Sequence, residues 1–305
     1  MSSHPRNTET IERIEEALSG CASKVERSAP SRWRACMVNG STTWLDVRLV
    51  DTTWLVMESP ATRKGRSPAP WGLLRRNQQL PAGLKFVRTE SPRRARLRAE
   101  LVLESDLATL SERVREACES CRDAMEATRS SVRGTPDLEG EEVNEGVDLA
   151  GLCEEAGWPC YERSSGRVAV PLEVRDGGGQ ALVAPRGRNG LIVTAEIHEG
   201  PRPGKTARRA LACLLLRATS LVRLVRAYAD PGENGVSVGL EVCLSTRRDA
   251  SSLSGALSAL SVAWELCGLE APAVLDEGIA RQYLTRVEGV GAPSRVDDSV
   301  AVLTG

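Results

Sequence analysis

The chain alternates between stretches with a hydrophobic period of two and stretches with a helical period. Between residues 43 and 50, the apolar side chains of Leu45, Val47 and Leu49 occupy every second position. This alternation predicts a half-buried β-strand. Residues 106–128 instead place apolar side chains three or four positions apart, which predicts an amphipathic helix. Glycine-rich turns separate the short runs, as expected of an antiparallel meander.

These patterns occur twice in the same order, which indicates a tandem duplication. The segment QALVAPRGRNGLIVTAE aligns without a gap over TTWLDVRLVDTTWLVME, and GLEVCL parallels RAELVL before a closing helix. We therefore predict an α+β fold with two tandem copies of an antiparallel sheet that has helices on one face. Each copy has the order helix, three-strand meander, helix, two strands, helix, and a C-terminal helix follows the second copy. The predicted segments are a disordered tail (1–8), a first α+β domain (9–128), an acidic linker (129–146), a second α+β domain (147–268) and a C-terminal helix with a tail (269–305).

The composition indicates a cytoplasmic protein. The chain has 305 residues, of which 41% are hydrophobic and 27% charged, as is typical of globular proteins with two domains. It has no apolar run long enough to cross a bilayer and no signal-peptide pattern at the N-terminus, so we expect no membrane partner. The nine cysteines are scattered through apolar segments, which favours reduced core thiols over disulfides. Only four of the 40 basic residues are lysine, which suggests a bacterial, GC-rich genome.

The charges are distributed unevenly along the chain. Eleven basic side chains lie between Pro60 and Arg98 against one acidic side chain, and a second arginine-rich stretch follows Arg186 in the other copy. The segment from Asp137 to Asp148 is acidic and contains no basic residue, so it is typical of a linker. The arginines suit an acidic protein partner or nucleic acid, and they also suit an ordinary solvated surface.

No segment carries a specific catalytic motif. The loop Gly200–Thr206 ends in Gly-Lys-Thr, but it is one residue too short for a phosphate-binding loop and two prolines remove amide donors. The Cys118/Cys121 spacing resembles half of a zinc site, with Cys153 and Cys160 as the other candidates, yet the first pair lies in a predicted helix. We therefore predict no enzyme activity, no cofactor and no metal.

The order of elements resembles the type III secretion chaperone and YbjN-like superfamily. The strands TWLDVRLVDTTWLVME and QALVAPRGRNGLIVTAE carry this resemblance, together with LRAELVL and VGLEVCL. It implies a domain that binds a segment of a partner polypeptide and works as a dimer, so two fused copies would form an intramolecular pseudo-dimer.

We expect the protein to be a non-catalytic chaperone or adaptor, with a nucleic-acid-binding accessory protein as the alternative. The candidate contact residues are aromatic side chains on adjacent strands, which suit strand addition and stacking, and arginines of both copies. An alternative interpretation is that the tryptophans are buried in the core or between the two copies. These residues are Trp44, Trp54, Arg93, Arg94, Arg96, Arg186, Arg188, Arg208 and Arg209.

Overall fold

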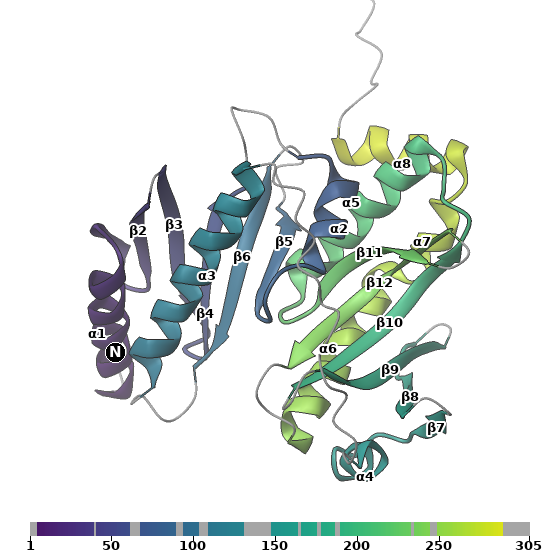
Figure 1. The fold of residues 1–305 in the computed structure, drawn as a ribbon, viewed down its shortest axis with the longest axis horizontal. Coiled ribbons are helices and arrows are strands. Elements are labelled where there is room, and N and C mark those ends of the chain that lie inside the picture. Colours follow the sequence, from purple (N-terminus) through teal and green to yellow (C-terminus); the bar gives the residue numbers. More distant parts are fainter. Residues whose placement is uncertain are drawn as a thin grey trace, which may run out of the picture.

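Two sheets of six antiparallel strands, placed side by side, form the body of the protein (Figure 1). The computed structural model describes residues 5–39, 41–61, 68–89, 94–103, 109–130, 148–163, 166–175, 178–186, 190–232, 235–244 and 249–288. Each sheet is formed by its own copy of one series of elements.

The first copy begins with a helix, continues through four strands and a short helix, and closes with two strands and a long helix. Its elements are α1 (Pro5–Cys21), β1 (Lys24–Ala29), β2 (Arg32–Asn39), β3 (Ser41–Val50), β4 (Trp54–Pro60), α2 (Pro70–Asn77), β5 (Leu84–Arg88), β6 (Ala95–Val102) and α3 (Leu110–Ser130). The sheet has the order β1-β2-β3-β4-β6-β5.

The second copy repeats this series. Its elements are α4 (Leu149–Glu155), β7 (Tyr161–Arg163), β8 (Arg167–Leu172), β9 (Gly179–Arg186), β10 (Gly190–Gly200), α5 (Lys205–Leu221), β11 (Arg226–Gly232), β12 (Gly235–Leu244) and α6 (Ala250–Cys267), followed by α7 (Glu270–Ala273) and α8 (Glu277–Glu288). Read from its outer edge, the sheet has the order β7-β8-β9-β10-β12-β11, which matches the first sheet strand for strand. The predicted fold class is thus confirmed, with one addition: each meander has four strands, because a short edge strand, β1 or β7, pairs with the next strand.

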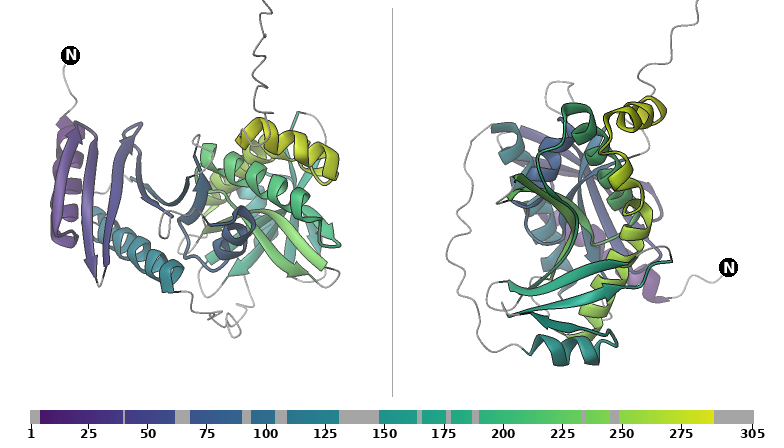
Figure 2. Two further views of the ribbon diagram at one scale, coloured as in Figure 1. Left: turned by 90° about the horizontal axis from the view of Figure 1, so that it is seen from above. Right: turned by 90° about the vertical axis from the view of Figure 1, so that its right-hand side faces the viewer.

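Helices cover one face of each sheet. The alternation in β3 buries Leu45 and Val47 on the side of α1 and α3, which pack against each other. In the second copy, α6 packs against β8, β9, β10 and β12. Figures 1 and 2 show α3 on one side of the first sheet and α6 on the opposite side of the second, so the uncovered faces of the two sheets point in opposite directions.

Helix α5 is buried nearly all round because it lies between the copies. Its buried residues fall on every side of the helix, from Ala207 and Leu211 to Leu216, as expected of a helix enclosed by protein. It contacts α2 and β5 of the first copy and α6 and α8 of its own. The run LACLLL therefore marks a central helix.

Several predicted boundaries differ from those of the structure. Helix α1 begins at Pro5, so residues 5–8 of the predicted tail are helical, and α3 continues to Ser130. Most of the predicted acidic linker lies outside the described residues. Asp148, at the end of that acidic stretch, caps α4 by accepting a hydrogen bond of 2.8 Å from the Gly151 amide. Among the described residues, no helix has the length and hydrophobicity needed to cross a bilayer.

Candidate functional site

The two copies contact each other through equivalent elements. Helix α2 of the first copy packs against β11 of the second, α5 of the second packs against β5 of the first, and the two helices also pack together. Strands β5 and β11 are the inner edges of their sheets, and they face each other (Figure 1). This exchange of equivalent contacts is the pattern of an isologous two-fold interface, here within one chain.

Asn77, at the end of α2, links the two inner edges. Its side-chain Oδ1 accepts a hydrogen bond of 2.6 Å from the Phe86 amide in β5. Its Nδ2 donates a hydrogen bond of 2.7 Å to the Ala227 carbonyl in β11. Asn77 is fully buried, so these bonds satisfy backbone groups that an open sheet edge would leave unpaired.

Two buried cations extend across the interface in opposite directions. Lys85 on β5 donates to the carbonyls of Val222 and Val225, at 2.7 and 3.1 Å. Arg226 on β11 donates to the carbonyls of Leu80 and Pro81, at 2.7 and 3.2 Å. Each cation thus binds the loop that precedes the inner edge strand of the other copy.

Each buried cation is also paired with a glutamate of its own copy. Lys85 lies 2.9 Å from Glu100, with both side chains 2% exposed, and Arg226 lies 2.5 Å from Glu241. Burial lowers the pKa of Lys85 to about 8, while the ion pair with Glu100 opposes this shift. Glu100 additionally accepts a hydrogen bond of 2.7 Å from the Leu224 amide of the second copy.

A row of charged side chains crosses the uncovered face of the first sheet. The row has one residue on each strand, in the sheet order β1-β2-β3-β4-β6-β5, and each residue is directly opposite the next one on the adjacent strand. The row, in strand order, is Glu26, Arg34, Asp46, Glu58, Arg98 and Lys85, and we call it the charged row. Arg34 pairs with Asp46, and Glu58 pairs with Arg98. Arg96 joins Asp46 to Glu58, at 2.9 and 3.6 Å, and Glu100 joins Arg98 to Lys85.

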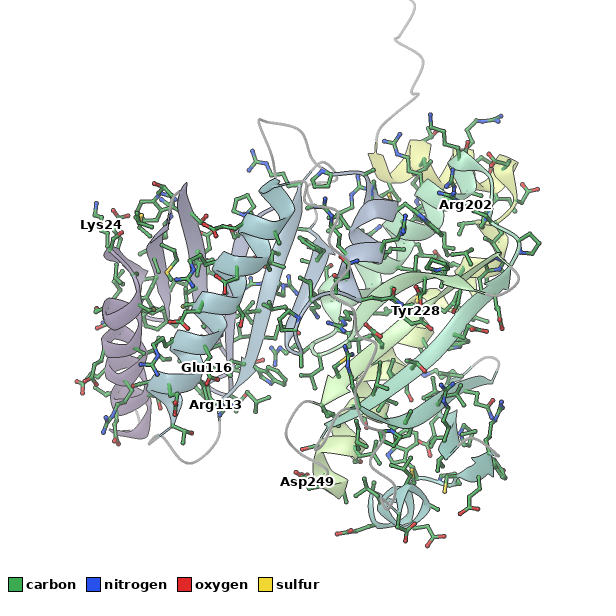
Figure 3. The ribbon with its side chains drawn as sticks, in the orientation of Figure 1. Lys24, Arg113, Glu116, Arg202, Tyr228 and Asp249 are labelled. Carbon is green, nitrogen blue, oxygen red and sulfur yellow. The ribbon has the colours of Figure 1, made fainter. Side chains whose placement is uncertain are left out.

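The exposure of the charged row drops sharply between its outer members and those nearest the second copy. The Arg34 and Asp46 side chains are 50% and 48% exposed, whereas Glu58 and Arg98 are 9% and 8% exposed. Arg98 also donates a hydrogen bond of 2.7 Å to the Ser220 carbonyl of the second copy. The inner part of the row therefore belongs to the interface, and only the outer part, over β1 to β3, is accessible to a partner. Lys24, at this outer edge, is labelled in Figure 3.

The equivalent row of the second sheet has a different chemistry. It consists of Tyr161, Ala169, Leu182, Thr194, Glu241 and Arg226. The third and fourth members are twelve residues apart in both copies (46 and 58; 182 and 194), which supports the equivalence. Only the buried cation at the inner end recurs in place, as Lys85 and Arg226. Glu241 takes the position of Arg98, whereas Glu100, the partner of Lys85, lies two residues further along β6. The copies therefore share a buried acid–cation pair at their interface and differ on their outer strands.

The two candidate tryptophans lie on the uncovered face of the first sheet but not together. Trp54 pairs with Val50, six residues along β3 from Trp44, which separates them by about 20 Å at the usual rise of a strand. Trp44 is half-buried and lies under the Arg34 guanidinium, 4.9 Å from the ring centroid. Trp54 lies under Arg223 of the second copy at 5.2 Å, which places it between the copies.

The candidate arginines do not converge on one surface. Arg96 belongs to the ion-pair network above, and Arg94 is exposed just before β6. Arg186 donates to the Cys243 sulfur at 2.8 Å, and Arg208 lies 5.9 Å from the centroid of Trp71 in the contact between α5 and α2. Arg209 is exposed on α5, while Arg93 and Arg188 lie outside the described residues.

The candidate metal and nucleotide positions have other roles. Cys118 and Cys121 are fully buried on the core side of α3, and desolvation raises the pKa of Cys121 to about 12. Within the part of the chain that the structure describes, no three His, Cys, Asp or Glu side chains are grouped to hold a metal ion. In the glycine loop, Gly204 is the N-cap of α5 and the Ala207 amide donates to Glu277 at 3.4 Å.

Burial of six charged side chains was not predicted from the sequence: Glu58, Lys85, Arg98, Glu100, Arg226 and Glu241. One signal could have identified the pairs at the inner edges: Lys85 lies between the apolar residues of the strand LKFVR, and Glu100 and Glu241 occur in the aligned strands RAELVL and GLEVCL. A charge on a strand with two buried faces requires a partner, and the recurrence in both copies points to the contact between them.

Comparison with known proteins does not assign the chain to a family. No family model matches the sequence, and no curated protein matches it. Two solved structures are weakly similar. The di-domain ARO/CYC BexL from the BE-7585A biosynthetic pathway is 12% identical with a TM-score of 0.17, covering 91% of this chain and 94% of its own. The di-domain ARO/CYC StfQ from the steffimycin biosynthetic pathway is 10% identical with a TM-score of 0.14, covering 93% and 96%. At these scores, neither likeness bears on fold or function.

Proposed function

We propose that this protein is a non-catalytic chaperone or adaptor that binds a segment of a partner polypeptide. One observation carries the proposal: the copies bury their inner edge strands and the inner part of the charged row against each other, while exposed side chains remain on the outer edge strands β1 and β7 among the described residues. The outer edge strand β7 is exposed along its whole length. An accessible edge and sheet face are what an extended polypeptide uses for strand addition.

The internal pairing supports the resemblance to secretion chaperones and YbjN-like domains. Both sheets have the same strand order, and α2 and α5 exchange equivalent contacts. We propose that the chain is an intramolecular pseudo-dimer, in which one polypeptide supplies both subunits of the family's usual dimer. A fused pair lets the two copies diverge on their outer strands while their contact is maintained.

The state of the arginines favours a protein partner over nucleic acid. A nucleic-acid surface presents cations to successive phosphates. On the first sheet, Arg34 and Arg96 are instead neutralised by Asp46 and Glu58. Carboxylates among the cations repel a continuous polyanion, whereas a polypeptide can match alternating charges along its side chains.

Affinity capture from the source organism, followed by reconstitution, tests this function. The full chain, tagged at one end, is incubated with lysate at low and high salt, with and without nuclease, and retained proteins are identified by mass spectrometry. The expected result is one retained polypeptide, insensitive to nuclease, whose binding is reproduced by calorimetry with purified components and with a short segment of the partner. Retention of nucleic acid alone, or loss of every retained protein on nuclease treatment, would refute the proposal.

A further inference from the structure

Two arginines oppose each other on the uncovered face of the first sheet. Arg32 on β2 and Arg48 on β3 are directly paired in the strand register, next to the charged row. Like charges directly opposite each other destabilise an antiparallel pair. In the described residues Arg32 makes no ion pair, and Arg48 has only a distant one, 3.5 Å from Glu58.

Arg48 also retains an unused donor. Its Nε atom is buried and has no hydrogen-bond partner in the described structure, although the side chain as a whole is 41% exposed. The one carboxylate near it, Glu58, is already shared with Arg98 at 2.6 Å and Arg96 at 3.6 Å. The exposed part of the Arg48 side chain lies opposite the unpaired Arg32. Two facing arginines with incomplete pairing are an arrangement that a bound anion completes, because a carboxylate accepts from two guanidinium groups at once.

We propose that Arg32 and Arg48 bind a carboxylate side chain of an extended, acidic partner segment that lies across β2 and β3. This inference rests on the proposed function and names the face and the chemistry of its partner. Trp44, half-buried and four residues from Arg48 along β3, offers the same segment an apolar contact. The accessible Asp46 and Glu26, 48% and 42% exposed, favour a segment in which acidic positions alternate with neutral or basic ones.

The second copy does not repeat this site. The gapless sequence alignment places Arg48 over Arg186, but the strand register shifts this correspondence by two residues. Arg48 pairs with Val56 and Ala184 with Ile192, each eight residues on, so Arg48 corresponds to Ala184 on β9. The neighbouring positions Ala169 and Leu182 are apolar. The carboxylate site is therefore specific to the first sheet, and the two outer faces bind different chemistry.

Peptide binding to charge-neutralised variants tests the site. The probes are a fluorescein-labelled peptide of alternating glutamate and valine, its counterpart with glutamine for glutamate, and an oligothymidylate of the same length, each measured by fluorescence anisotropy. The test variant is Arg32→Gln/Arg48→Gln. The matched control is Arg13→Gln/Arg115→Gln, which removes two cations of 48% and 54% exposure from the helices over the opposite face.

We expect the glutamate peptide to bind the wild type and the control alike, and to bind the test variant about tenfold more weakly, as for loss of one charge-assisted hydrogen-bonded pair. The single variant Arg32→Gln should weaken binding without lowering the melting temperature, which separates the effect from misfolding. Equal binding by test and control variants, equal binding of the glutamine peptide, or tighter binding of the oligothymidylate would overturn the inference.

The purified partner segment from the capture experiment separates this inference from the proposed function. Wild-type affinity of Arg32→Gln/Arg48→Gln for that segment would overturn the carboxylate site and leave the proposed function intact. Failure of the wild type to retain any polypeptide would overturn the proposed function, and this inference with it.

Discussion

Replacing Lys85 by methionine removes the central cation of the contact between the copies at nearly constant volume. The change leaves Glu100, 2% exposed, without its nearest counter-charge, and it leaves the carbonyls of Val222 and Val225 without their donor. Breaking a buried ion pair by removing one partner costs about 3–5 kcal/mol. Arg98 remains 3.5 Å from Glu100, so we expect a loss at the lower end, about 3 kcal/mol.

A second lysine–glutamate pair provides the control. Lys24 lies 2.6 Å from Glu26, but the side chains are 63% and 42% exposed, and exposed pairs contribute about 0–1 kcal/mol. Urea unfolding followed by circular dichroism should therefore show a large shift of the midpoint for Lys85→Met and almost none for Lys24→Met. The double variant Lys85→Met/Glu100→Gln should recover part of the loss, because it removes the unpaired charge and keeps an acceptor for the Leu224 amide. Equal midpoints for the two lysine variants, or a double variant less stable than the single one, would refute the argument.

Three further predictions concern stability. The pKa of Lys85 falls to about 8 in the folded chain from an ordinary 10.5, so between these pH values the unfolded chain binds one more proton than the folded chain. The free energy of unfolding of the wild type, relative to that of Lys85→Met, should therefore rise with pH in this window. A difference that does not change with pH would contradict the shift. Gly239→Ala should lower the free energy of unfolding by about 1–3 kcal/mol through overpacking, since a Cβ there would lie 2.5 Å from the Ala195 carbonyl oxygen and 2.9 Å from the Tyr228 hydroxyl. An unchanged melting temperature would contradict this steric argument. Trp54→Ala should lower the melting temperature more than Trp44→Ala, because only Trp54 stacks across the contact between the copies, and calorimetry would detect the reverse order if Trp44 were the structural residue.

The local elements were largely predictable from the sequence because their patterns are short-range. The alternation in β3 and the helical spacing of Leu110 and Val114 in α3 each follow from which side chains must face a core. The duplication was also visible, since the two copies keep the order of their elements. The loop between α5 and β11, residues 222–225, does not follow from a short-range pattern. The helix continues to Leu221 and Leu224 adopts a positive φ of 67°, because this loop is shaped by Lys85 and Glu100 of the other copy.

The candidate site was predicted less well for the same reason. The sequence placed Trp44 and Trp54 on neighbouring strands, and the two side chains do lie on the same face of the sheet. The strand register, however, places them at opposite ends of β3, and Trp54 contacts Arg223 of the second copy. The arginines appeared as a block in the sequence, and the structure divides them among ion pairs, a sulfur contact and ring contacts.

What the sequence by itself determined is the succession of strands and helices, its repetition, and which side of each element is apolar, since these depend on neighbours a few residues away. The tertiary structure alone decided how the copies meet. The bonds from Lys85 to Val222 and Val225 join residues 137 and 140 positions apart, and no local pattern encodes such a distance. They form because a buried charge requires compensating partners, a requirement that exposed cations such as Arg32 and Arg34 do not have.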